Sequence, residues 1–198
     1  MNDPKLLRQL KAGDERAFRT LVEQHQRLIY SVCFRILSDS AEAEELTQET
    51  FIRAFQAIPA FEDRAKLSTW MCKIAVNLCY NRVQYLKRRG SQAKRSIEAF
   101  VGDAWETQVE GRAPLTGHIQ SPEEALTTVE TEALLTRALS MMSESLRSLV
   151  VLRDVEGMSY QEICEITELP IGTVKSRLHR ARGELVRLYE GLQRGDIQ

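Results

Sequence analysis

The stretch SYQEICEITELPIGTVKSRLHRARGEL, residues 159–185, decides the fold of the C-terminal part of the chain. Ser159 and Glu162 have the spacing of a capping box, which predicts the start of a short helix. Residues 168–172 contain both proline and glycine, and therefore predict a compact turn. A second helix is expected after the turn, because apolar residues recur there at helical spacing. These residues are Val174, Leu178, Ala181, Leu185 and Leu188.

The remaining faces of this second helix are basic and polar. A short helix, a tight turn and a second helix of this kind are typical of a helix-turn-helix that enters the DNA major groove. Lysine and arginine neutralise phosphates, while serine, histidine and arginine reach base edges. A helical hairpin with a solvated basic face is the alternative, which the capping box and the turn disfavour. The candidate DNA contacts are Thr173, Lys175, Ser176, Arg177, His179, Arg180 and Arg182.

The rest of the chain also predicts helices, and no stretch alternates with the period of a strand, so the fold class is all-α. Asp14 is expected to cap a helix over residues 15–37. The next helix should end at Pro59 and place Phe55 inward. Ser68 or Thr69 is expected to cap a third helix, which runs from about residue 70 to about residue 89 with Leu86 on its apolar side.

Glycine and proline mark a boundary between two helical domains. Four of the ten glycines and two of the five prolines lie between residues 90 and 122. A structureless segment of this length is uncommon inside one compact domain. The expected organisation is therefore a domain over 1–90, a flexible acidic linker over 91–121 with room for a short helix near 97–101, and a second domain over 122–198.

The net charge of −1 is the sum of blocks with opposite charge along the chain. Residues 61–96 carry nine basic and two acidic groups, residues 97–170 carry four and fourteen, and residues 171–198 carry six and three. Two basic blocks are therefore separated by an acidic middle. Such asymmetry points to contact with nucleic acid or a membrane surface.

The first basic block predicts a second nucleic-acid surface, because aromatic and amide side chains alternate there with basic ones. Basic groups can follow a strand backbone while aromatics and amides engage unstacked bases. Trp70 is equally compatible with a position in the core. The basic run at 87–89 is equally compatible with a solvated helix end. The candidate residues are Arg64, Lys66, Trp70, Lys73, Asn77, Asn81, Lys87, Arg88 and Arg89.

Several other classes of protein are disfavoured by the sequence. No apolar run is long enough to span a bilayer, and the N-terminus lacks the pattern of a secretory signal, so we expect a cytoplasmic protein. The four cysteines and three histidines show no close ligand pairs. We therefore expect no metal and no cofactor, and buried or half-buried thiols.

Three blocks together resemble the sigma-70 family, in its compact extracytoplasmic-function class, which keeps conserved regions 2 and 4. The blocks are AEAEELTQETFIRAF (41–55), FEDRAKLSTWMCKIAVNLCYNRVQYLKRR (61–89) and LRSLVVLRDVEGMSYQEICEITELPIGTVKSRLHRARGEL (146–185). They cover nearly the whole chain outside the linker. One departure is Met142-Ser143, where the family usually has Leu-Pro before a helix; Ser143 can still cap that helix.

The resemblance implies a role for each block. The first would dock on the clamp helices of the largest subunit of RNA polymerase through Glu45, Gln48, Glu49 and Arg53. In the second, the loop 61–67 and Asn77 would receive a base flipped out of the −10 promoter element, and the basic helix would hold the DNA backbone. In the third, the residues that face the −35 groove would be Lys175, Ser176, His179 and Arg180.

The implied protein is an alternative sigma factor with no catalytic residues, used in stress responses. Its partners would be core RNA polymerase, through the clamp helices and the flap, promoter DNA and an anti-sigma factor that is often membrane-bound. Two rival interpretations stay open from the residues alone. One is a helix-turn-helix regulator with an N-terminal helical sensor domain, and the other is an enzyme that uses Cys72, Cys79 and a histidine as a metal or thiol site.

Overall fold

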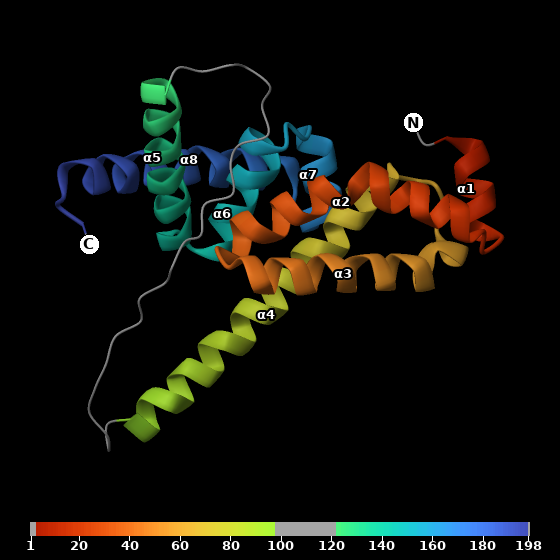
Figure 1. Ribbon diagram of the computed structural model, residues 1–198, viewed down its shortest axis with the longest axis horizontal. Helices are drawn as coiled ribbons and strands as arrows, with labels where there is room; N and C mark the ends of the chain where they lie inside the picture. The colour runs from red at the N-terminus through yellow and green to blue at the C-terminus, as the bar shows by residue number, and fades with distance from the viewer. Residues whose placement is uncertain (1–2, 98–121, 198) are drawn as a thin grey trace.

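The computed structural model describes residues 3–97 and 122–197, and within these ranges every regular element is a helix (Figure 1). The prediction of an all-α fold is confirmed. A short 3₁₀ turn, Ile58–Ala60, follows α3, and a π-helical turn, Val151–Val155, follows α6. The α-helices are α1 (Pro4–Lys11), α2 (Glu15–Leu37), α3 (Ser40–Ala57), α4 (Leu67–Ile97), α5 (Pro122–Met141), α6 (Glu144–Val150), α7 (Tyr160–Thr167) and α8 (Ile171–Arg194).

The first four helices, called the N-terminal group here, pack around α2, which contacts both α3 and α4. Asp14 caps α2 as expected, since its Oδ1 accepts the backbone N–H of Arg16 at 2.8 Å. Asp39 caps α3 in the same way, through the N–H of Glu42 at 2.9 Å. Each such cap satisfies an orphan N–H of the first helical turn and is worth about 1 kcal/mol.

The third predicted helix is longer at both ends than the sequence indicates. Trp70 donates its backbone N–H to the carbonyl of Lys66 at 3.0 Å, so the first hydrogen-bonded turn of α4 spans residues 66–70. Ser68 and Thr69 therefore lie inside the helix and do not cap it. At the other end α4 continues through Gly90 to Ile97, because one glycine costs only about 1 kcal/mol among strong helix formers. The rest of the short helix expected near 97–101 lies outside the described residues.

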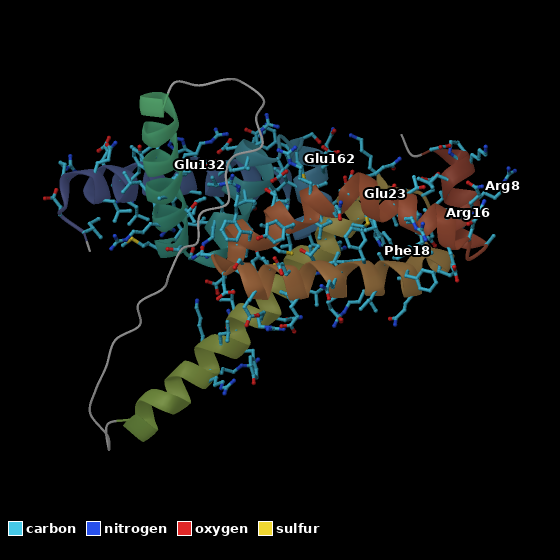
Figure 2. The ribbon with its side chains drawn as sticks, viewed as in Figure 1. Arg8, Arg16, Phe18, Glu23, Glu132 and Glu162 are labelled. Carbon is cyan, nitrogen blue, oxygen red and sulfur yellow. The ribbon has the colours of Figure 1, made fainter. Side chains whose placement is uncertain are left out.

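Two apolar side chains expected inside are exposed at the surface. Phe55 is 46% exposed, although its ring meets that of Phe18 edge to face with centroids 4.9 Å apart (Figure 2 labels Phe18). Leu86 is 42% exposed on α4. Helix α1 was not expected at all, yet Asp3 accepts the N–H of Lys5 at 2.9 Å and Pro4 occupies the first turn, which is a standard helix start.

The last four helices, called the C-terminal group here, contain the helix-turn-helix. The capping box is confirmed: Ser159 donates its N–H to Glu162 Oε2 at 2.8 Å, and Glu162 donates its N–H to Ser159 Oγ at 3.2 Å. Glu168 then adopts a left-handed conformation (φ 57°), which ends α7 and turns the chain into α8. Helix α8 packs on α5, α6 and α7.

The two groups lie against each other, with α7 on α4, and with α5 and α6 on α2 (Figure 1). Arg147 of α6 is buried at this contact and donates through Nη1 to the carbonyl of Ile36 at 2.5 Å, near the C-terminus of α2. Its Nη2 donates to the carbonyls of Ser140 and Met142. A cation at the carbonyl end of a helix is favourable, because the helix dipole is negative there.

Replacement of Leu21 by alanine tests the core of the N-terminal group. Leu21 has no exposed surface, so Leu21→Ala should lower the free energy of unfolding by about 3–5 kcal/mol, through lost burial and the cavity left behind. Leu86→Ala is the matched control, because the same atoms are removed from a side chain that is 42% exposed. Urea unfolding measures both, and equal losses would contradict the core assigned to Leu21.

Candidate nucleic-acid interface

Helix α8 separates its residues onto two opposite faces. Val174, Leu178 and Ala181 are at most 1% exposed and form the apolar face that packs on the other helices. The predicted −35 contacts lie on the remaining faces, where all are exposed except the half-buried Thr173. Because the apolar face is held by packing, the polar face is presented in a fixed orientation.

Four of these residues share one side of α8. Lys175, Ser176, His179 and Arg180 follow each other at i, i+1, i+4 and i+5, which places them side by side on a helix. A strip of two cations and two hydrogen-bonding side chains can contact both phosphates and base edges. Lys175 also lies above the ring of Tyr160, with Nζ 5.7 Å from the centroid.

Arg182 has a different environment from the other predicted −35 residues. Its guanidinium forms a two-pronged ion pair with Asp154, with Nε 2.9 Å from Oδ2 and Nη2 2.5 Å from Oδ1. The pairing raises the pKa of Arg182 above its usual value. This geometry ties α8 to the turn after α6, so Arg182 is already engaged within the protein.

Helix α4 carries most of the second predicted surface. Arg64, before α4, and Asn77, Asn81, Lys87, Arg88 and Arg89 are exposed. Trp70 is half-buried, and its ring lies against the buried Phe61 with centroids 4.9 Å apart. One side of the ring therefore joins the core, and the contact of Trp70 with DNA stays a prediction.

The structure also brings three predicted −10 residues against acidic residues of the C-terminal group, which the sequence did not indicate. Lys66 Nζ lies 2.8 Å from Glu162 Oε1, and Lys73 Nζ lies 2.6 Å from Glu168 Oε1. Lys87 Nζ lies 2.8 Å from Glu144 Oε2. The pKa of Glu162 is lowered to about 2, by the hydrogen bond from Lys66 and then by the backbone N–H of Ser159.

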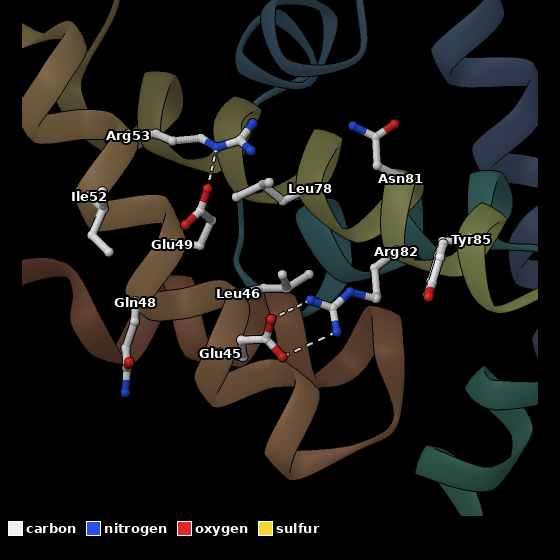
Figure 3. Close-up of a pocket in the computed structure, with 10 residues that line it drawn as sticks. All are labelled: Glu45, Leu46, Gln48, Glu49, Ile52, Arg53, Leu78, Asn81, Arg82 and Tyr85. Carbon is white, nitrogen blue, oxygen red and sulfur yellow. Dashed lines mark hydrogen bonds and ion pairs between the residues drawn. The ribbon is translucent and has the colours of Figure 1, made fainter.

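The four predicted polymerase contacts lie together in one surface pocket between α3 and α4 (Figure 3). Arg53 Nε pairs with Glu49 Oε1 at 2.7 Å, and Arg82 pairs with Glu45 at 2.5 Å. The pocket is lined by Glu45, Leu46, Gln48, Glu49, Ile52, Arg53, Leu78, Asn81, Arg82 and Tyr85.

Sequence reasoning missed several residues of this pocket. Arg82 joins α4 to α3 through Glu42 as well as Glu45. Ile52 and Tyr85 are large side chains that are 52% and 53% exposed. Ile52 lies between Glu49 and Arg53 in the sequence, so its place on the same face could have been noticed. Tyr85 and Arg82 belong to another helix, and only the folded chain brings them to this pocket.

The cysteines of the described part of the chain are buried or half-buried, as expected. Cys33, Cys72 and Cys79 are buried, and Cys164 is half-buried. Burial raises the pKa of the Cys72 thiol. In the hydrogen-bonded pair of Cys33 and Cys79, the pKa of Cys79 is raised and that of Cys33 is lowered. Thiols with raised pKa values are poor nucleophiles. Among the residues described, no cluster of three or more histidine, cysteine or acidic side chains could hold a metal ion.

Within residues 3–97 and 122–197, no helix has the length and apolar character needed to cross a membrane.

Known proteins match the chain along nearly all of its length. The family model for sigma-70 region 2 matches residues 21–89, and that for sigma-70 region 4 matches residues 132–185. The RNA polymerase sigma-H factor of Pseudomonas aeruginosa is 32% identical over 97% of this chain and 96% of its own. The ECF RNA polymerase sigma factor SigW of Bacillus subtilis is 33% identical over 91% of this chain and 93% of its own.

Two solved structures share the fold. The sigma factor RpoE of Bartonella quintana, in complex with the anti-sigma factor NepR, is 25% identical and covers 87% of this chain and 96% of its own, with a TM-score of 0.62. CnrH, in complex with the cytosolic domain of CnrY, is 20% identical and covers 94% and 96%, also with a TM-score of 0.62. With both family regions present and full-length relatives above 30% identity, the chain belongs to the sigma-70 family as an extracytoplasmic-function sigma factor, a factor that directs transcription initiation.

Proposed function

We propose that this sigma factor reads the −35 element with the exposed strip on α8 and the −10 element with α4 and the loop before it. The observation that carries the −35 assignment is the division of α8 into a buried apolar face and an exposed strip of Lys175, Ser176, His179 and Arg180. Residues 1–90 would form the −10 and polymerase-binding domain, residues 91–121 the linker, and residues 122–198 the −35 domain.

The −10 assignment rests on the arrangement around the start of α4. Taking one base out of the stack costs a few kcal/mol, so a reader needs a shaped surface with polar groups for the base edge. Asn77 is exposed on α4 and offers an amide for this purpose. Two modest DNA surfaces on one chain strengthen each other, because binding of the first raises the local concentration of the second.

The pocket between α3 and α4 is the proposed contact with core RNA polymerase. It combines exposed apolar surface at Ile52 with the paired charges of Glu49 and Arg53. An apolar centre with a charged rim is the usual composition of a protein–protein interface. The polymerase would perform the chemistry, so the sigma factor itself would not be an enzyme, and it would act in the cytoplasm, where promoter DNA is transcribed.

We also propose regulation by an anti-sigma factor, since the solved structure of the sigma factor RpoE contains one. Such a factor could be attached to the inner membrane. The rival function, a helix-turn-helix regulator with its own sensor domain, would require dimers on a palindromic operator. Region 2 of the sigma-70 family at residues 21–89 argues against it, because this region occupies the place of the sensor.

Reconstitution with core polymerase tests the proposed function. Core enzyme plus this protein should start transcripts at specific sites, each preceded by a shared −35 and −10 pair, because the two readers act on one chain. Sequencing of transcript 5′ ends on genomic DNA measures this outcome, with core enzyme alone as the control. Absence of both specific initiation and co-purification with core would contradict the function.

Two variants should separate DNA reading from polymerase binding. Asn77→Ala should weaken open-complex formation by roughly 5- to 100-fold, the value of one specific base contact, and leave affinity for core unchanged. Ile52→Asp should weaken binding to core by roughly 30-fold or more, because it places a charge in an apolar contact. Each variant is the control for the other in filter binding and in pull-down with core. Equal loss of both activities in either variant would assign that residue to the fold.

A further inference from the structure

Arg82 crosses from α4 to α3 inside the pocket that the proposed function assigns to polymerase. Its Nη2 lies 2.5 Å from Glu45 Oε1, and its Nη1 lies 3.2 Å from Glu45 Oε2, so the guanidinium meets the carboxylate side on. Figure 3 shows these two contacts as dashed lines. Nη1 also donates to Glu42 Oε2. One arginine of α4 therefore holds two acids of α3.

The three side chains of this cluster differ in their exposure to solvent. The side chains of Arg82 and Glu42 are 23% and 25% exposed, whereas that of Glu45 is 63% exposed. Arg82 and Glu42 therefore lie mostly beneath the surface, and Glu45 lies at it. A carboxylate has about four positions at which it can accept a hydrogen bond. Since Arg82 uses only two of them, Glu45 keeps acceptor positions for a partner.

Without Arg82, the acids on this face of α3 would repel one another. Glu42 and Glu45 are three residues apart, and Glu45 and Glu49 are four apart, so the three carboxylates share one face of the helix. Glu49 is paired with Arg53 of its own helix, and Arg82 compensates the other two. The hydrogen bond from Arg82 lowers the pKa of Glu45 below its usual value, which keeps this carboxylate charged.

The packing of α4 directs Arg82 toward α3. Leu78, four residues earlier on α4, is 7% exposed and lines the pocket together with Leu46 of α3. Leu78 and Arg82 share a helix face, so burial of the leucine turns the arginine toward the same neighbour. A planar guanidinium that binds a carboxylate at two points leaves it less freedom than a single contact would. Glu45 is therefore held in one direction.

We propose that Arg82 is a positioning residue for the polymerase contact, which orients Glu45 toward polymerase without itself touching polymerase. This inference rests on the proposed function of the pocket between α3 and α4. Polymerase would meet a carboxylate whose direction is already set, so less side-chain freedom would be lost on binding. A residue that acts in this way affects binding only while Glu45 is present, which a contact that merely supports the fold does not.

Binding of the full chain to core polymerase, measured by biolayer interferometry, tests this role. Arg82→Met keeps an apolar stem but removes the charge and the donors, so it should weaken binding by roughly 5- to 30-fold, the effect of one interface contact. Arg82→Lys should recover part of this loss, because an ammonium can hold one oxygen of Glu45 but not both. The matched control is Arg8→Met on α1, outside the pocket, which should leave the affinity unchanged (Figure 2 labels Arg8).

A double-mutant cycle with Glu45→Ala distinguishes positioning from support of the fold. When Glu45 is already absent, Arg82→Met should weaken binding to core by no more than about 2-fold, because its effect passes through the missing carboxylate. Far-UV circular dichroism of each variant checks that the helices are retained. If Arg82→Met does not fold, Arg82→Lys takes its place in the cycle, and its smaller loss should likewise disappear in the Glu45→Ala chain.

Two results would overturn the proposal. A loss of affinity that is the same with and without Glu45 would show that Arg82 does not act through this carboxylate. An affinity of Arg82→Met equal to that of Arg8→Met would show that Arg82 has no part in binding. Failure of the proposed function has a different signature, because Glu45→Ala and Ile52→Asp would then both leave binding to core unchanged, and the role of Arg82 would be refuted with it.

Discussion

The burial of one face of α4 is the constraint on which the rest of the structure depends. Met71, Ala75, Val76 and Cys79 have no exposed surface, and they lock α4 against the other helices of the N-terminal group. With that face held, the polar residues of α4 have fixed directions. Part of α4 lines the pocket shared with α3, and another part faces the C-terminal group.

In the C-terminal group, the buried face of α8 likewise fixes the directions of its polar residues. Its buried stripe is provided by Val174, Leu178 and Ala181, with Leu185 and Leu188 packed beside it, and the exposed positions between them carry polar residues. In both helices the core therefore determines the orientation of the proposed DNA contacts. The acids that face α4 complete the electrostatic pattern, since the acidic middle of the chain is brought against the basic block that precedes it.

Local signals in the sequence were sufficient for much of the fold. The caps at Asp14 and Ser159 and the stripe of α8 involve residues a few positions apart, so the pattern alone predicts them. Helix α1 had an equally local signal in Asp3 and Pro4, but its eight residues bury only Leu7 and Leu10 and give little periodicity. Gly90 marks a helix end in the sequence pattern, yet α4 continues through it to Ile97.

The contacts between the two groups could not be predicted in this way. Lys66 and Glu162 are separated by 96 residues, and nothing in their immediate neighbours marks them as partners. The same holds for Arg82, whose partners on α3 lie 37 and 40 positions away. Exposed charges also lack the burial pattern that reveals a core position. Such pairs become visible only when packing has placed the helices.

Zero-length cross-linking tests most directly the central claim, that the buried face of α4 fixes the directions of its polar residues and turns three of its lysines toward the C-terminal group. A carbodiimide joins an amine to a carboxylate only where the two are in contact, and mass spectrometry identifies the joined peptides. The account predicts Lys66–Glu162, Lys73–Glu168 and Lys87–Glu144 cross-links in the free chain. Absence of all three cross-links from the free chain would contradict this orientation of α4.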